Sequence, residues 1–186
     1  MHVFSRVDEP YVPAPPAPRW AVRAAHAAAL VTLPTGVWRL LLAAGFPAGY
    51  TATGYAAMDA TGRGAVYLVA LSVVSEVLAL LTLGLVRPWG EVVPSRVPGW
   101  GGRVVAPRVV TAVAGCGAVV LTLLWTPFVA WWALPHPDLT DTGAVVVGLL
   151  YLPLTAWGPL LGAVTVAYHR RHRASPSPNS ATRSAC

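Results

Sequence analysis

LSVVSEVLALLTLG, Leu71 to Gly84, is an apolar segment that contains one glutamate. It belongs to a run from Ala65 to Val86 in which Glu76 is the single charged residue. A helix of about 20 apolar residues spans roughly 30 Å of hydrocarbon, so this run predicts a transmembrane helix. An ionisable group at such depth is costly unless it has a partner. Glu76 therefore predicts a polar contact inside the membrane.

The composition of the whole chain is that of a membrane protein. Of its 186 residues, 55% are hydrophobic and only 11% are charged, whereas a soluble domain has about 25% charged residues. Three further runs are long enough to span a bilayer. The sequence therefore predicts an all-α, integral membrane four-helix bundle within residues 21–170, with helices near 22–45, 65–86, 109–134 and 143–168.

The arginines predict the orientation of the chain in the membrane. They make up all thirteen basic residues, as is typical of a GC-rich bacterial genome. Eleven fall before the first helix or at its start, between the second and third helices, or after the fourth. Because cytoplasmic segments are enriched in arginine, both termini are predicted to be cytoplasmic. We expect a multi-pass protein of the bacterial cytoplasmic (inner) membrane.

Both ends of the chain are predicted to be largely disordered. Residues 1–20 form a polar, proline-rich lead-in that lacks the apolar core of a cleaved signal peptide. Residues 171–186 form a basic tail that is rich in serine and proline.

Recurrent spacings raise the hypothesis that the helices form two related hairpins. GAVYL at 64–68 resembles GLLYL at 148–152, and a proline precedes a tryptophan by four positions in three helices. Transporters with repeated helical units show such internal similarity. With 18 prolines and 8 tryptophans, chance can also produce these matches, and both interpretations remain open. The proline and tryptophan pairs are Pro34 and Trp38, Pro127 and Trp131, and Pro153 and Trp157.

Arg39 is the second charged residue expected inside the membrane. It lies roughly 9 Å from the outer end of its helix and Glu76 roughly 16 Å, at about 1.5 Å per residue. Pairing offsets the cost of burying each charge, so we expect Arg39 and Glu76 to face each other. With Thr35, Ser72 and Ser75 they form a candidate intramembrane polar pocket. Such a pocket either fixes the helix register or lines a substrate or ion path, and both interpretations stay open.

The loop between the second and third helices is the candidate lipid interface. Four prolines between residues 87 and 108 prevent one long helix. Tryptophans prefer the headgroup region and arginines are attracted to anionic lipid. We therefore expect the loop to contact anionic headgroups at the cytoplasmic face through Arg87, Trp89, Arg96, Trp100 and Arg103.

Other site classes have weaker support. His136, Asp138 and Asp141 share a short outer loop, where imidazole and carboxylate groups can bind a divalent metal, but a polar turn and a helix N-cap account for the same residues. We predict no metal, no cofactor and no catalytic residue. Nucleic acid is not an expected partner, because the arginines flank apolar runs and do not cluster on a folded surface.

Two motifs carry a resemblance to a known group of proteins. LPTGVWR at 33–39 and RPWGEVVP at 87–94 resemble segments of uncharacterised small multi-pass membrane proteins of high-GC actinobacteria. The resemblance implies a bacterial inner-membrane location and no particular activity.

The sequence favours a non-enzymatic role through contacts with lipid, a membrane protein partner or a second copy of the chain. One alternative is a small transporter or channel-like protein that uses Arg39 and Glu76. The other is a membrane-embedded enzyme that acts on a lipid or quinone, with Glu76 as its acid or base.

Overall fold

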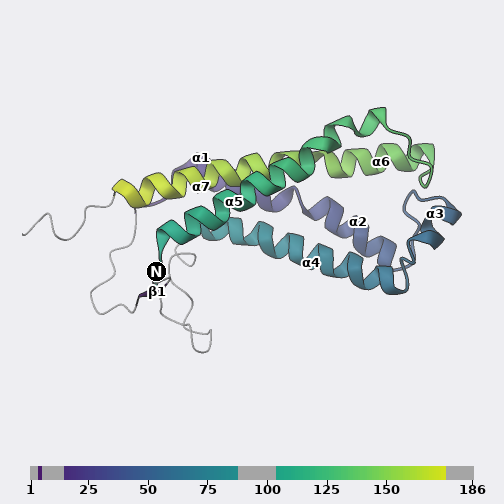
Figure 1. Ribbon diagram of the computed structural model, residues 1–186, viewed down its shortest axis with the longest axis horizontal. Coiled ribbons are helices and arrows are strands. Elements are labelled where there is room, and N and C mark those ends of the chain that lie inside the picture. Colours follow the sequence, from purple (N-terminus) through teal and green to yellow (C-terminus); the bar gives the residue numbers. More distant parts are fainter. Residues whose placement is uncertain (1–3, 6–14, 88–103, 175–186) are drawn as a thin grey trace, which may run out of the picture.

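The structure, a computed structural model, describes residues 4–5, 15–87 and 104–174. It confirms the predicted all-α fold. Four helical spans are long and apolar enough to cross a membrane, namely Arg19–Ala43, Arg63–Gly84, Pro107–Ala133 and Asp141–Arg173. They lie side by side along the long axis of the molecule (Figure 1).

The spans are divided into shorter elements. The first span contains α1 (Arg19–Leu30) and α2 (Leu33–Ala43), and the second is α4 (Arg63–Gly84). The third contains α5 (Pro107–Trp125) and the 3-10 helix η2 (Thr126–Ala133). The fourth contains α6 (Asp141–Tyr151), the 3-10 helix η3 (Leu152–Ala156) and α7 (Trp157–Ala174). A short helix, α3 (Ala52–Ala57), lies in the first outer loop. The two-residue strands β1 (Phe4–Ser5) and β2 (Val104–Val105) pair in antiparallel orientation.

Three of the four spans are interrupted, a feature that the sequence prediction missed. The α-helix stops between Leu30 and Leu33, at Trp125 and at Tyr151, and each following element has a proline in its first turn. Proline lacks the N–H that would continue the helical ladder, and its ring clashes with the preceding turn. The prolines therefore account for all three interruptions, including the break between α1 and α2 near the middle of the first span.

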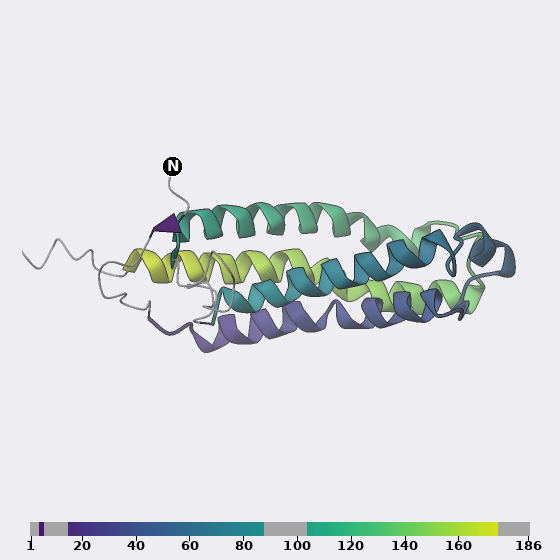
Figure 2. The same cartoon turned by 90° about the horizontal axis from the view of Figure 1, so that it is seen from below.

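The first span packs against two other spans, whereas the third packs mainly against one and lies at an edge of the bundle. The first packs against α4 through both of its helices, and against the fourth span through α1 on α7 and α2 on α6. The principal partner of α5 is α7, and Figure 2 shows α5 along one edge of the bundle. In the most apolar window of each span, 6% of the residues are buried in the third against 44% in the first. Most of the third span is therefore left for lipid or a partner to cover.

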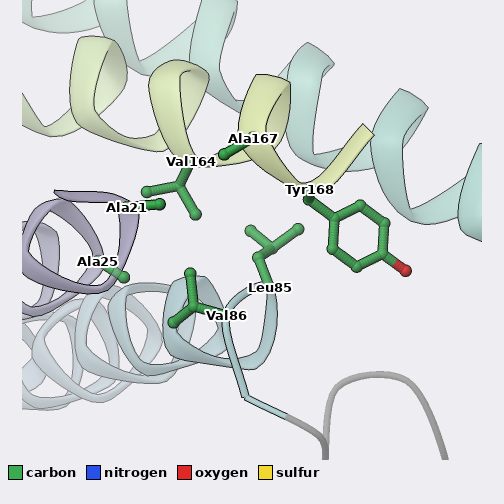
Figure 3. Packing of buried hydrophobic residues seen from close by; sticks show 7 residues of the cluster. All are labelled: Ala21, Ala25, Leu85, Val86, Val164, Ala167 and Tyr168. Carbon is green, nitrogen blue, oxygen red and sulfur yellow. The ribbon is translucent and has the colours of Figure 1, made fainter. Parts of the chain in front are cut away.

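A buried cluster joins three helices at the end of the bundle where the described chain begins and ends (Figure 3). Alanines in α1 allow its backbone to approach its neighbours closely, which is the usual way that membrane helices pack. Figure 1 places the start of α1, the end of α4, the start of α5 and the end of α7 at this end. The cluster comprises Ala21, Ala25, Leu85, Val86, Val164, Ala167 and Tyr168.

Reciprocal backbone bonds join the two loops at the opposite end of the bundle. The Thr51 N–H donates to the Asp138 carbonyl at 2.9 Å, and the Thr140 N–H donates to the Gly49 carbonyl at 3.0 Å. Both threonines also cap helices: Thr51 accepts from the Gly54 N–H and Thr140 from the Gly143 N–H. The backbones of the two outer loops are therefore joined to each other, and the duplication of the hairpins stays a prediction.

Candidate functional site

The predicted polar residues gather where α2 meets α4. Residues three and four positions apart share one face of a helix, and this spacing aligns Thr32, Thr35, Gly36 and Arg39 on one side and Ser72, Ser75 and Glu76 on the other. We call these seven residues the polar seam. Hydrogen bonds join its two sides, so residues 36 to 44 positions apart in the chain meet inside the bundle.

Arg39 is almost completely buried in the seam, with 3% of its surface exposed. Its Nη2 donates to the Thr35 hydroxyl at 3.2 Å and its Nη1 to the Ser75 hydroxyl at 3.4 Å. Its Nε donates to the Tyr151 hydroxyl at 3.4 Å, and the guanidinium lies 5.8 Å from the centre of the Tyr151 ring. These partners are all neutral. Arg39 thereby ties α2 to α4 and to the end of α6.

Glu76 has a different set of neighbours. Its Oε2 accepts a hydrogen bond from the Thr32 hydroxyl at 3.1 Å. Its Oε1 is buried and has no hydrogen-bond partner among the described residues. A Cβ atom built on Gly36 would lie 3.0 Å from Oε1, closer than side chains ordinarily approach. A glycine at position 36 therefore leaves room for the Glu76 carboxyl group beside the first turn of α2.

Among the described residues the structure contains no ion pair between Arg39 and Glu76. The predicted pocket residues Thr35, Ser72 and Ser75 do lie in the seam with them. Side chains of a helix lean toward its N-terminus, which carries the Arg39 guanidinium back to Thr35 and Ser75. The two charged residues thus share one interface but bind different hydroxyl groups.

The contact between Gly36 and Glu76 predicts a reversal in the effect of one substitution. Alanine is favoured over glycine inside a helix by up to about 1 kcal/mol. In a Glu76→Ala background, Gly36→Ala should therefore stabilise the protein. With Glu76 present, the added methyl group must displace the carboxyl group, and we expect the gain to vanish or to become a loss. Unfolding midpoints of the four proteins in detergent measure this coupling, and equal effects of Gly36→Ala in both backgrounds would contradict it.

Most of the predicted lipid-interface loop lies outside the described residues. Arg87 is described and exposed at the end of the second span. Trp89, Arg96, Trp100 and Arg103 fall within 88–103, outside the part of the chain that the structure describes. The role of this loop at anionic headgroups stays a prediction.

The outer loop that contains His136, Asp138 and Asp141 is stabilised by ring stacking and a helix cap. His136 stacks on Trp131 with ring centres 3.6 Å apart, and Thr140 caps α6 while Asp141 is the first residue of that helix. Within the described residues no three His, Cys, Asp or Glu side chains form a metal-binding group. Nearby, burial raises the pKa of the Tyr50 phenol above its ordinary value, and interactions with Tyr151 and Asp138 raise it further.

A groove on the side of the bundle is the feature that the sequence interpretation missed. It lies between α4 and α5 with α7 contributing to its wall, and it has a volume of about 520 Å³. We call it the lateral groove. Its helices are apolar on most faces, so periodicity carried no signal of which face would remain uncovered. Its walls include Leu78, Leu81, Leu85, Val110, Val113, Ala114, Gly117, Leu121, Trp157 and Leu161.

Comparison with known proteins does not place the chain in a family. No family model, curated protein or solved structure matches it. The class of protein therefore rests on its own architecture: four helices long and apolar enough to cross a membrane, as a multi-pass membrane protein requires.

Proposed function

We propose that this protein is a non-enzymatic, multi-pass protein of the bacterial cytoplasmic membrane that binds an apolar chain, such as a lipid tail, in the lateral groove. The observation that carries the proposal is the lateral groove. Its walls are mainly aliphatic side chains, and it lies between helices that are long and apolar enough to cross a membrane. The arginine distribution supports cytoplasmic termini. The resemblance of LPTGVWR and RPWGEVVP to actinobacterial membrane proteins supports the bacterial location.

The chemistry of the groove suits an apolar ligand. Its volume of about 520 Å³ falls within the roughly 300–1,000 Å³ of ordinary ligand sites. No charged residue is among its described lining. The hydroxyl of Thr82, which lines it, already donates to the Leu78 carbonyl at 3.3 Å. Dispersion contacts with the aliphatic walls are therefore the main interaction that a ligand can make in the lateral groove.

The polar seam supports a structural role for Arg39 and Glu76 in preference to a transport path. Thr32, Thr35 and Ser72 are buried and their hydroxyl groups have hydrogen-bond partners. Neither Arg39 nor Glu76 lines the lateral groove. The transport alternative rests on the break between α1 and α2 beside Glu76, because broken helices also mark transporter sites. The buried, hydrogen-bonded hydroxyl groups of Thr32 and Thr35 beside that break favour the structural role.

A groove-filling substitution tests the proposal. Ala114 lines the groove, so Ala114→Phe should fill part of it. Cys116 lies on the same helix, is exposed and lines neither the lateral groove nor the cavity on the other face of α5. Cys116→Phe is therefore the matched control.

The measurement uses nanodiscs that contain phosphatidylcholine with a photoactivatable acyl chain. We expect crosslinks to α4, α5 and α7 in the wild-type protein, at least a threefold loss in Ala114→Phe, and no comparable loss in Cys116→Phe. Unfolding midpoints of the three proteins verify that all are folded. Equal crosslinking of the two variants at the groove would reject the lateral groove as a binding site.

A further inference from the structure

A second groove lies on the other face of the α5 and α7 pair. It has a volume of about 700 Å³ and shares none of its lining residues with the lateral groove. Small residues of both helices, Gly115, Ala118 and Gly162, form part of its wall. A Cβ atom built on Gly115 would meet none of the described residues within 4 Å, whereas one on Gly162 would lie 3.6 Å from the Ala118 Cβ. The groove is therefore open beside Gly115 and closely walled beside Gly162.

One end of this groove is basic. His169, Arg170 and Arg173 line it near the C-terminal end of α7. Arg170 and Arg173 are exposed and His169 is half-buried, so their N–H groups can reach a ligand. The described lining contains no carboxylate. We call this second groove the basic groove.

The apolar walls and the basic end of the groove together indicate which class of ligand it binds. A free inorganic anion would make no use of the apolar walls, and a neutral lipid would make no use of the arginines. Basic pockets between membrane helices bind the headgroups of anionic lipids, and arginine presents several donors to a phosphate group. An anionic phospholipid satisfies both ends of the groove.

We propose that the basic groove is an anionic phospholipid site. Arg170, Arg173 and His169 bind the phosphate, and one acyl chain lies along the small residues at Gly115. The site is separate from the lateral groove and takes a different ligand, one selected by its charge. It also does not depend on which face of the membrane the termini occupy.

Lipid retention measured by native mass spectrometry tests the headgroup end. The protein is purified with an equimolar mixture of phosphatidylglycerol and phosphatidylcholine. We expect the wild-type protein to retain phosphatidylglycerol at least fivefold over phosphatidylcholine, and Arg170→Gln/Arg173→Gln to lose this preference. The control, Arg19→Gln/Arg23→Gln, removes the same charge from exposed positions of α1 at the same end of the bundle and outside the groove. It should keep the preference.

A second variant tests the acyl-chain end without changing any charge. Gly115→Leu places a side chain in open space, so it should block the groove and leave the fold intact. We expect it to reduce phosphatidylglycerol retention by at least threefold at an unfolding midpoint no lower than that of the wild type. Equal losses in the two double arginine variants would mean that binding is diffuse electrostatic attraction, and full retention in Gly115→Leu would mean that no chain lies in the groove. Either result overturns the proposal, and neither bears on the Ala114→Phe test of the lateral groove.

Discussion

Replacing Gly158 with alanine is expected to lower the free energy of unfolding by about 1–3 kcal/mol, the usual cost of overpacking a close contact. Gly158 lies in the first turn of α7, where that helix crosses α5. A Cβ atom there would lie 2.5 Å from the Thr122 backbone nitrogen and 2.8 Å from the Ala118 carbonyl oxygen, and would overlap the Thr122 hydroxyl. Backbone atoms cannot move aside without separating the helices. Because α7 is the principal partner of α5, the third span should be loosened.

Gly162→Ala is the matched control on the same helix. Its Cβ atom would make an ordinary contact, 3.6 Å from the Ala118 Cβ, and alanine favours the helix by up to about 1 kcal/mol. We expect this variant to be as stable as the wild type or more stable. Unfolding by increasing mole fraction of SDS in mixed micelles measures both. If Gly158→Ala were no less stable than Gly162→Ala, the result would contradict the close contact between α5 and α7 at Gly158.

The second large effect is expected at the outer end of the bundle, where Gly143→Ala should also cost about 1–3 kcal/mol. A Cβ atom on Gly143 would overlap the Gly49 carbonyl oxygen and lie 2.8 Å from the Gly49 Cα. That carbonyl accepts hydrogen bonds from the Thr140 N–H at 3.0 Å and from the Thr140 hydroxyl at 3.2 Å. Gly49 has φ +101°, a conformation that other residues adopt only with strain. The loop cannot move without losing these bonds.

Thr142→Ala is the control for this position, because Thr142 is the exposed neighbour of Gly143. A surface substitution of this kind usually changes stability by less than about 0.5 kcal/mol. Limited proteolysis of the loops around Gly49 and Asp138 provides a local readout beside the SDS midpoint. We expect faster cleavage in Gly143→Ala only. Wild-type cleavage and stability in Gly143→Ala would show that the two loops are not joined as the structure has them.

The four spans were predictable because they depend on length and hydropathy alone. The run around Glu76 is long and apolar enough by itself, and the structure places the second span at Arg63–Gly84. The seam was predictable in part. Helical spacing puts Ser72 and Glu76 on one face, and the cost of burying Arg39 required neighbouring polar groups. Thr35 and Ser75 are among those groups.

Other features depend on contacts between distant residues. Tyr151 is 112 positions from Arg39 in the chain. No local sequence pattern predicts that the Tyr151 hydroxyl accepts a hydrogen bond from Arg39. Pro34, Pro127 and Pro153 were visible in the sequence, but proline is tolerated inside membrane helices when other groups compensate. The sequence alone therefore did not show that each proline would end its α-helix.

Four apolar helices follow from the amino-acid sequence, because the energy of burying a helix in hydrocarbon is a sum over its own residues. The sequence also marked Arg39 and Glu76 as groups that need partners. The identity of the partner hydroxyl groups, and the grooves on two faces of α5, depend on how the helices pack. The physical reason is that membrane helices are about as apolar toward lipid as toward each other, so close packing and hydrogen bonds choose their neighbours.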